Sequence, residues 1–565
     1  MKAWPMTKHS NPAPTPVTKI PTANDFWFLP LGGSGEIGMN LNLYGHDGQW
    51  LMVDLGITFG DRFGIDIITP DPEFIVQNKE RLVALVLTHA HEDHVGAVPY
   101  LWPLLRCPVY ATKFTAEILR DKIREFPWAK EMEIIEIPLS GTVQIGKFGV
   151  EFITLTHSIP EPNALAITTP LGTVMHTGDW KIDPDPLVGE ATDAVKLSSW
   201  GDKGILAMVC DSTNVFSEGF SGSEEAVRQE LNSLIGEQPT KRVVVACFAS
   251  NVARLETAML AAKKYNRKVC LLGRSMDRMV KAAQKSGYLK ELPDFIDGNA
   301  AMKLPPEDVM IVSTGSQGEP RSALSRLSND SHPFVKLDSR DVVFFSSRVI
   351  PGNERSISVL QNNLVRKNIE LITSHEEDIH VSGHPARDEL RQMYKWVRPH
   401  LLIPVHGELR HMTEQAKLGR ESGIPKTLVP ENGTLIRMER DNPAIIDIVP
   451  VGRMGFDGTR LVPMVNPMLR DRARLAVQGT LFISINVDKN ATLSKTPQVT
   501  FVGVCSGGEE HERLDREVHK VIRQTINNGY RTVEGLKEEL RNGIRRSVNQ
   551  WIGKKPVTEI HVIQG

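Results

Sequence analysis

The sequence predicts an α/β protein in which two sheet-containing regions are followed by a small C-terminal α/β domain. Between residues 26 and 210, short apolar runs alternate with polar turns, a pattern typical of a strand-rich layer. Between residues 205 and 350, apolar runs are separated by segments of helical spacing, and this strand–helix–strand repetition indicates a parallel sheet. Residues 479–565 combine short strands with two amphipathic helices, which predicts a separate domain.

The length and composition are those of a multidomain globular protein. A chain of 565 residues is expected to form about two to four domains. Hydrophobic residues make up 41% and charged residues 24% of the chain, so sizeable cores can form without disulfide bonds or other cross-links. The formal net charge of −2 gives no support for nucleic-acid binding. It still allows a local basic groove, because electrostatic steering depends on how charge is distributed.

Cysteine usage and the N-terminus indicate a cytoplasmic protein. The five cysteines form no CxxC pair and their number is odd, so we interpret them as reduced residues rather than as disulfides or a zinc knuckle. No apolar stretch approaches the roughly 18 residues of a membrane span, and the N-terminus lacks the apolar core of a signal peptide. Residues 1–22 contain five prolines and three lysines, which predicts a disordered extension.

The expected strands of both sheet-containing regions end in polar residues. In the first region they are Trp50–Asp54, Leu82–Leu87, Val150–Leu155 and Thr173–Met175. In the second region they are Ile205–Cys210, Val243–Phe248, Lys268–Leu272, Val309–Val312 and Val342–Phe345, with helices such as Glu224–Ile235 and Val252–Lys264 between them. Because ligands bind at the carboxyl ends of parallel strands, the polar residues there predict a binding site.

The remaining third of the chain has three parts. Residues 375–450 return to short strands followed by histidine-rich turns, and residues 451–478 have the scattered Gly, Pro and Arg of a linker. The last domain is expected to contain strands near Leu481–Val487, Gln498–Val504 and Val557–Ile563, with two helices between Glu510 and Trp551. These helices are rich in Arg and Lys, which fits a solvated face, a subunit contact or an RNA contact.

The segment Thr88-His89-Ala90-His91-Glu92-Asp93-His94 carries the strongest functional signal. Three histidines and two acids within six residues do not suit a packed core, because each buried imidazole needs a hydrogen-bond partner. Imidazole nitrogen and carboxylate oxygen are good ligands for Zn²⁺. The HxHxDH pattern predicts two metals, with His89 and His91 on one side and Asp93 and His94 on the other.

Three further residues at strand ends can complete a shell for two metals. His157 follows the apolar run Phe152–Thr156, Asp179 follows Thr173–Met175, and His406 follows Leu401–Ile403. Each alone would more often be a structural polar residue. Together with the HxHxDH segment they predict a dinuclear metal site.

A glycine motif near the N-terminus imitates a dinucleotide-binding site. Gly33–Gly38 matches GxGxxG, and Asp54 lies near the spacing of a ribose-binding acid. A dinucleotide site needs a helix directly after the glycines, whereas Met39–Tyr44 alternates polar and apolar residues like a strand. We therefore expect a turn between two strands that lets the backbone approach the metal site. Glu36 and Asn40 are expected to support the metal ligands there.

The metal motifs resemble the metallo-β-lactamase superfamily. Asp54 in Val53-Asp54-Leu55-Gly56 matches the first motif, an aspartate that orients ligands. HxHxDH matches the second motif, His157 the third and Asp179 the fourth. The resemblance implies one ion on His89, His91 and His157, a second on Asp93, His94 and His406, and Asp179 bridging both. It further implies two Zn²⁺ per subunit, with Mn²⁺ or Mg²⁺ as alternatives, roughly 3.5–4 Å apart around an activated water that attacks phosphorus.

Additional motifs resemble the β-CASP nucleases and, within them, the ribonuclease J family. Asp211 in DSTN matches motif A, His384 in HVSGH matches motif B and His406 matches motif C. With GGSGEIGMN, STGSQGEP, IPGNE and PVHGE, the resemblance covers residues 26–450. It implies a metallo-β-lactamase αββα sandwich with an inserted parallel-sheet β-CASP domain and a small C-terminal α/β domain. The expected parts are an extension (1–22), metallo-β-lactamase domain (23–222 and 371–455), β-CASP domain (223–370), linker (456–478) and C-terminal domain (479–565).

The resemblance also implies a mechanism and a substrate. His384 would protonate the leaving 3′ oxygen or bond a phosphate oxygen, and the catalytic residues would be Asp93, His384 and Asp211. A pocket for a 5′-phosphate is expected from His380, Ser382, Gly383, His384, Ser347 and Arg348. Arg348-Val349 stands where the family is expected to have smaller or proline-containing residues, which leaves the shape of that pocket open.

The expected activity is hydrolysis of RNA in maturation and decay, both 5′-to-3′ from 5′-monophosphate ends and internally. The resemblance implies a homodimer or homotetramer in the cytoplasm, RNA-processing partner proteins and no membrane. Preference for RNA rests on the resemblance alone, because no residue that would read a 2′-hydroxyl is identified. A DNA nuclease or another metal hydrolase of the superfamily is the alternative. A non-catalytic RNA-binding subunit fits less well, because all seven candidate ligands are present.

Overall fold

The computed structural model describes residues 19–488, 492–530 and 532–564. Most of the predicted extension, residues 1–18, lies outside the described residues. The chain divides into two compact units, one reaching Phe59 and resuming at Ile67–Arg453, the other formed by Gly60–Asp66 and Met454 onward. In the described part of the chain, no helix is both long and apolar enough to cross a bilayer.

Two large sheets form the core of the first unit. The eight-stranded sheet has the order β22-β21-β1-β2-β3-β6-β7-β8. Its strands are β1 (Phe26–Gly32), β2 (Leu41–His46), β3 (Gln49–Val53), β6 (Leu82–Val86), β7 (Val109–Ala111), β8 (Ile134–Glu136), β21 (Thr434–Arg437) and β22 (Ala444–Ile448). The seven-stranded sheet has the order β20-β19-β13-β12-β11-β10-β9. Its strands are β9 (Thr142–Ile145), β10 (Phe148–Thr154), β11 (Asn163–Thr169), β12 (Gly172–His176), β13 (Ile205–Asp211), β19 (Pro399–Val405) and β20 (Lys426–Thr427).

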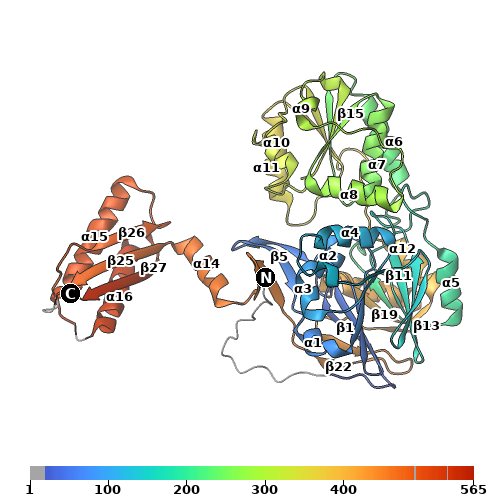
Figure 1. The fold of residues 1–565 in the computed structure, drawn as a ribbon, viewed down its shortest axis with the longest axis horizontal. Coiled ribbons are helices and arrows are strands. Elements are labelled where there is room, and N and C mark those ends of the chain that lie inside the picture. Colours follow the sequence, from blue (N-terminus) through green and yellow to red (C-terminus); the bar gives the residue numbers. More distant parts are fainter. Residues whose placement is uncertain (1–18, 489–491, 531, 565) are drawn as a thin grey trace. The chain divides into compact units, whose positions relative to one another are not determined.

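The two sheets pack face to face, and helices cover them (Figure 1). Phe28 and Val86 of one sheet share a buried core with Phe152 and Val209 of the other. The first sheet is accompanied by α1 (Glu73–Gln77), η1 (Lys79–Arg81), α2 (Glu92–Val95), α3 (Val98–Leu105), α4 (Lys113–Ile123) and η2 (Ala129–Glu131). The second packs on α5 (Ala194–Lys203), α12 (Arg387–Val397) and α13 (Leu409–Glu421). This is the expected αββα sandwich.

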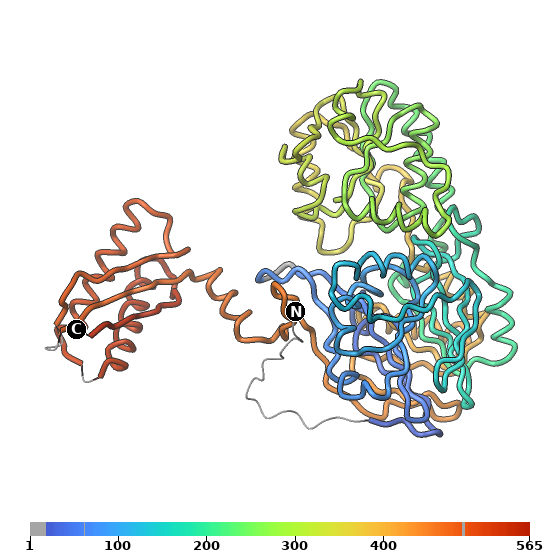
Figure 2. Tube along the Cα trace, in the orientation of Figure 1, coloured from blue at the N-terminus to red at the C-terminus, as the bar shows by residue number. Residues whose placement is uncertain are grey.

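An inserted domain interrupts the sandwich between β13 and β19 (Figures 1 and 2). Its five-stranded sheet is parallel throughout, in the order β15-β16-β14-β17-β18. The strands are β14 (Arg242–Ala246), β15 (Lys268–Leu272), β16 (Val309–Ser313), β17 (Asp341–Phe345) and β18 (Glu370–Thr373). The helices are α6 (Glu224–Gly236), α7 (Val252–Lys264), α8 (Arg274–Ser286), α9 (Gly298–Ala301), η3 (Pro306–Asp308), α10 (Ala323–Ser328) and α11 (Glu354–Val365).

Successive side chains of β14 point to opposite faces of this sheet, and both faces are covered by helices. Val243 and Val245 pack in the core that contains α6, α7 and α8. Val244 and Ala246 pack in the opposite core with α9, α10 and α11. All four side chains are apolar and fully buried, as expected for a central parallel strand with helices on either side.

The second unit contains a small α/β domain. Its three-stranded sheet, β26-β25-β27, is built from β25 (Thr480–Val487), β26 (Gln498–Val502) and β27 (Val557–Gln564). The helices α15 (Gly508–Asn527) and α16 (Val533–Ile552) share a buried core with this sheet. A further sheet has the order β24-β23-β5-β4, from β4 (Thr58–Arg62), β5 (Ile65–Pro70), β23 (Arg453–Asp457) and β24 (Arg460–Pro463). The range predicted as a linker, 456–478, contains β24 and the helix α14 (Pro467–Gln478).

A buried ion pair anchors the inserted domain. Arg254 on α7 is fully buried and donates to both carboxylate oxygens of Glu224 on α6, at 3.0–3.2 Å. Its other branch donates to Ser346 Oγ at 2.5 Å and to the carbonyl of Ile379 at 2.7 Å. One side chain therefore fixes the two loops in which the phosphate-pocket residues were predicted.

We expect Arg254→Ala to lower the free energy of unfolding by about 3–5 kcal/mol, because it leaves a buried carboxylate and two loop acceptors without their donor. Urea denaturation followed by fluorescence measures this loss. Arg228→Ala is the matched control, because Arg228 bonds Glu256 at 2.6 Å at a partly exposed site. That change should cost about 1 kcal/mol or less. Equal losses in the two variants would contradict the role assigned to Arg254.

Candidate metal centre

The predicted ligands come from the carboxyl ends of strands that reach one edge of the sandwich. His89 and His91 follow β6, and Asp179 follows β12. Asp211 ends β13 and His406 directly follows β19. Because β12, β13 and β19 are adjacent and parallel, their carboxyl ends lie together.

One group of ligand atoms comprises His89, His91, His157 and Asp179, all within 4.8 Å of one another. His91 Nδ1 lies 3.1 Å from His89 Nε2 and 3.1 Å from His157 Nε2. With metal–nitrogen distances of about 2.0–2.1 Å, neighbouring tetrahedral ligands would be about 3.3 Å apart. The spacing of these nitrogens therefore fits one Zn²⁺-sized ion.

A second group comprises Asp93, His94, Asp179 and His406. His406 Nε2 is 3.0 Å from Asp93 Oδ2, and His94 Nε2 is 3.1 Å from Asp179 Oδ2. The same Asp179 oxygen is 3.9 Å from His89 Nε2 of the first group. Asp179 thus lies in both groups, which is the position of a bridging carboxylate.

Hydrogen bonds on the outer side of each ring fix which nitrogen offers a lone pair. Thr88 Oγ1 donates to Asp54, so it accepts the Nδ1–H of His89 at 3.0 Å. His94 Nδ1 bonds Asp54 Oδ2 at 2.7 Å, and His157 Nδ1 bonds the carbonyl of Gly383. The Nε2 lone pairs of these rings consequently face the centre, where a cation satisfies them.

The pKa directions agree with a site built for cations. Burial lowers the pKa of His91 to about 4, so that ring is neutral and able to bind a metal at neutral pH. Burial also opposes protonation of His94 and His406, but neighbouring carboxylates outweigh it and raise both pKa values. In the absence of a metal these rings hold protons, which a bound metal ion would displace.

His384 and Asp211 form a third group that extends from the second. His384 Nδ1 lies 2.8 Å from Asp211 Oδ2, and its ring stacks on His406 at 5.5 Å between centroids. Burial opposes protonation of His384, but Asp211 outweighs it and raises the pKa. The His384 ring is therefore held beside the candidate metal ligands by its Nδ1, and its Nε2 does not bond Asp211.

The predicted phosphate-pocket residues occupy different surroundings. Ser347 is 5% exposed and accepts a hydrogen bond from Gln317 at 3.2 Å, whereas Arg348 is exposed. Ser382 Oγ accepts from the backbone N–H of His384 at 3.1 Å. Within the described residues, the buried Nδ1 of His380 has no hydrogen-bond partner.

Gly383 has a local structural role that the sequence did not indicate. A Cβ at this position would lie 2.7 Å from Cε1 of His157, closer than real contacts allow. The glycine lets its carbonyl meet Nδ1 of that ring. Gly383 therefore orients the ring of His157, a candidate metal ligand.

The glycine turn joins β1 to β2, which are antiparallel, so it does not lead into a helix. The carbonyl of Gly33 accepts from the backbone N–H of His406 at 2.6 Å, which brings the turn against a candidate metal ligand. Asn40 Nδ2 donates to the carbonyl of Asp93 at 3.0 Å. The side chain of Glu36 accepts from Asn432 at 2.6 Å and pairs with Arg453, so it stabilises the turn, while its backbone pairs with Gly407 beside His406.

Comparison with protein families matches the whole order of domains. The metallo-β-lactamase superfamily matches residues 39–243, and the β-CASP domain of ribonuclease J matches 240–364. A Zn-dependent metallo-hydrolase RNA specificity domain matches 374–430, and the ribonuclease J C-terminal domain matches 467–564. Ribonuclease J of Sinorhizobium meliloti is 40% identical over 95% of this chain and 96% of its own length. This chain belongs to the ribonuclease J family.

Other relatives extend the comparison. Ribonuclease J of Mycolicibacterium smegmatis is 37% identical over 93% of this chain and 94% of its own length. Ribonuclease J of Thermus thermophilus is 32% identical over 95% of each chain. A crystal structure of a protein of unknown function from Enterococcus faecalis shares the fold, with a TM-score of 0.51 and 17% identity over 73% of this chain and all of that one. As a member of this family, the chain is a metal-dependent ribonuclease with a divalent-metal site.

Thr213 is a residue of the candidate site that the sequence analysis did not single out. Its Oγ1 lies 2.7 Å from Asp211 Oδ1 and 2.7 Å from Nδ1 of His406. Since the hydroxyl donates its proton to the carboxylate, it accepts from His406 and turns Nε2 inward. Its place in the DSTN motif was the available signal, but a threonine after a strand is more often a simple turn residue.

We expect Thr213→Val to weaken metal binding about 10- to 100-fold, because the valine preserves shape while releasing the ring of His406. Competition with a calibrated chelator measures the affinity. Thr168→Val, which removes a hydroxyl bonded to Thr173 at 2.9 Å in the sandwich, is the control and should leave metal affinity unchanged. Wild-type affinity in the Thr213 variant would show that the hydroxyl does not orient the ligand.

Proposed function

We propose that this member of the family cleaves RNA with two divalent metals, in the 5′-to-3′ direction from 5′-monophosphate ends and also internally. The observation that carries the proposal is the pair of ligand groups that overlap at Asp179, with His384 beside them. The ligand set suits Zn²⁺, and Mn²⁺ or Mg²⁺ are the alternatives. A dinuclear site needs a carboxylate that can bind both ions, and Asp179 can do so because it belongs to both groups, each with three further candidate ligands.

The side chains assign the steps of hydrolysis. Bound divalent cations supply positive charge, which acidifies water to near neutral pH and offsets the charge of the phosphate. Attack of hydroxide on phosphorus breaks the bond to the 3′ oxygen, which must then take up a proton. Asp211 accepts the Nδ1–H of His384 and leaves Nε2 to donate to that oxygen or to a phosphate oxygen.

We assign recognition of the 5′-phosphate to the loops that carry Ser347, Arg348, His380 and Ser382. Arg348 Nη1 bonds Asn214 Oδ1 at 3.2 Å, and Asn214 Nδ2 bonds the carbonyl of His384 at 3.4 Å. This chain of contacts brings an exposed guanidinium from the inserted domain to the loop of His384. A planar guanidinium is suited to bidentate phosphate binding.

Digestion of one RNA with three different 5′ ends tests the proposal. We expect the 5′-monophosphate form to release mononucleotides progressively from that end, and the triphosphate and hydroxyl forms to be degraded mainly after internal cuts. Arg348→Ala should reduce the preference for monophosphate about tenfold, the cost of one charge-assisted phosphate contact. Equal rates on all three ends would contradict the pocket. Cleavage of DNA but not RNA of the same sequence would favour the DNA-nuclease alternative.

A further inference from the structure

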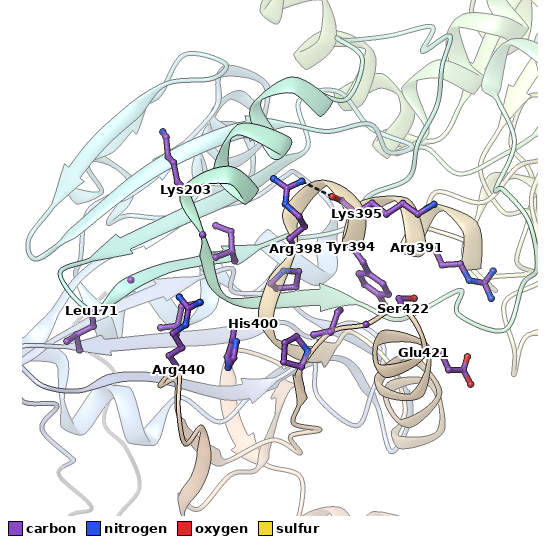
Figure 3. Close-up of a pocket in the computed structure, with 18 residues that line it drawn as sticks. Leu171, Lys203, Arg391, Tyr394, Lys395, Arg398, His400, Glu421, Ser422 and Arg440 are labelled. Atoms are coloured by element: carbon purple, nitrogen blue, oxygen red, sulfur yellow. Dashed lines mark hydrogen bonds between the residues drawn. The ribbon is translucent and has the colours of Figure 1, made fainter.

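A groove of about 1040 Å³ is lined by residues at the amino ends of strands in the seven-stranded sheet (Figure 3). The candidate metal centre lies at the carboxyl ends of the same strands. Ile205 and Pro399, the first residues of β13 and β19, line it. Asp211 and His406 stand at the other ends of these two strands. Seven residues of extended strand separate the groove from the centre by roughly 20 Å.

The groove is strongly basic although the whole chain is nearly neutral. Five of its lining residues are lysine or arginine and one, Glu421, is acidic. The basic residues, labelled in Figure 3, are Lys203, Arg391, Lys395, Arg398 and Arg440. They come from α5, α12, the turn before β19 and the turn between β21 and β22. Tertiary structure thus gathers positive charge that is dispersed along the sequence.

Much of this charge is not neutralised within the protein. Lys395 and Arg440 are exposed, and neither has an ion-pair partner among the described residues. Lys203 lies over the ring of Trp200, with Nζ 4.2 Å from the ring centroid, and keeps its charge uncompensated.

Two arginines do have acidic partners. Arg391 bonds Asp388 at 2.6 Å, and Arg398 bonds Asp202 at 2.5 Å. Both pairs are partly solvent-exposed, where an ion pair is weak and leaves further guanidinium N–H groups for another anion.

The lining favours phosphate over bases or an apolar peptide. Tyr394 is only 4% exposed, so it offers no ring face for base stacking. Leu171, at 40%, is the one exposed large apolar side chain among the lining residues. Protein interfaces depend on buried apolar or aromatic anchors, which this groove lacks, whereas guanidinium and ammonium groups are suited to the oxygens of a nucleic-acid backbone.

Helix α12 connects the groove with the catalytic residues. It begins at Arg387, three residues after His384, and extends for 11 residues, about 16 Å. Arg391 and Lys395 are four residues apart on this helix, so they lie on one face, and Arg398 follows directly after its last residue. An RNA strand leaving the site along this helix would meet the basic groove.

We propose that the groove binds the sugar–phosphate backbone of RNA whose 5′ end occupies the metal centre. The inference rests on the proposed function and adds a second contact, remote from the chemistry, that holds the body of a long substrate. Binding is independent of base sequence, because phosphates carry no sequence information. Short RNAs do not reach the groove and gain nothing from it.

The double variant Lys395→Ala/Arg440→Ala tests the assignment, because it removes the two unpaired charges without touching the catalytic residues. Affinity for a 5′-monophosphate RNA is measured across salt concentrations in the Asp179→Asn background, where the strand stays intact. For an RNA of about 40 nucleotides, we expect Kd to rise roughly 10- to 30-fold at about 0.1 M salt and the slope of log K against log salt to fall by about 1.4, or 0.7 per contact. Turnover of an RNA of about 5 nucleotides by the otherwise wild-type double variant should be unchanged.

The control is Lys79→Ala/Lys303→Ala, which removes the same charge from two exposed positions that do not line the groove. Its affinity for the long RNA should stay close to that of the wild type. An unchanged salt slope in the groove variant, or an equal loss in the control, would overturn the assignment. The assignment would also be overturned if the groove variant lost binding of free inorganic triphosphate but kept the wild-type affinity for RNA. If the unmodified protein cleaved neither RNA, the proposed function itself would fail instead.

Discussion

Replacing Asp179 by asparagine is expected to reduce RNA cleavage by about 10³-fold or more. The Asp179 carboxylate belongs to all three ligand groups, and one of its oxygens lies 3.1 Å from His94 Nε2, 3.7 Å from His406 Nε2 and 3.9 Å from His89 Nε2. The amide keeps the shape but not the negative charge that, in the proposed two-metal site, would bridge the cations. Metal ions contribute several kcal/mol to the stabilisation of such transition states, and each 1.36 kcal/mol is a factor of about ten in rate.

Rates on a 5′-monophosphate RNA and metal content by elemental analysis measure this effect together. The variant should retain fewer ions per subunit than the wild type and should fold normally, because the substitution removes no volume. Asp185→Asn is the matched control, because this aspartate lies six residues further along the chain and its side chain is exposed. A rate within tenfold of wild type at full metal content would show that Asp179 does not bridge the metals.

Replacing His384 by alanine is expected to lower kcat by about 10²- to 10⁴-fold while leaving metal binding intact. The ring of His384 bonds Asp211 at 2.8 Å and stacks on His406. It belongs to neither the first ligand group, which contains His91, nor the second, which contains His94. Its loss removes the proposed proton donor for the leaving 3′ oxygen. The effect should therefore appear in kcat more than in the affinity for RNA.

His411→Ala provides the control for this second change. His411 is also a buried histidine, but its ring contacts Phe216 at 5.2 Å between centroids. This variant should retain metal and activity close to wild type. An RNA with a better leaving group at the scissile bond should partly rescue the His384 variant, because such a bond needs less protonation. Complete loss of metal from the His384 variant would instead show that the His384 ring binds metal.

Residues that lie next to their own strand ends could be read from the sequence. The HxHxDH segment, His157, Asp179 and His406 each follow an apolar run. The parallel strands β12, β13 and β19 bring the ends before Asp179 and His406 together, whereas the HxHxDH segment follows a strand of the other sheet. The strand-rich region and the parallel sheet followed from periodicity, whereas the αββα sandwich with its inserted domain followed from the resemblance of the motifs to the family. The roles of these residues as ligands stay predictions, as do the domain boundaries, the subunit number and the partner proteins.

Partners that meet across long stretches of chain could not be read in this way. Thr213 and His406 are 193 positions apart, and Gly383 and His157 are 226 apart, so nothing in either local pattern indicates the contact. Glu36 was expected to support the ligands, and its backbone pairs with Gly407 beside His406, but the path of the turn directs its side chain to Asn432 and Arg453. Its position depends on packing against a segment nearly 400 residues away.

The sequence by itself determined the ligand types, their order and the two kinds of sheet, because these depend on residue chemistry and on periods of two and 3.6. Only the tertiary structure decided which ring nitrogen faces the centre, through the hydrogen bonds of Thr88, Asp54 and Gly383 to the outer nitrogens. It also holds Asp54 at a φ of 63° and His406 at 52°, backbone conformations that local preference opposes. It also gathered the basic groove, since its charges come from separate segments and the net charge of −2 hides them. Convergence of distant side chains is a property of packing, and no local pattern of residues contains it.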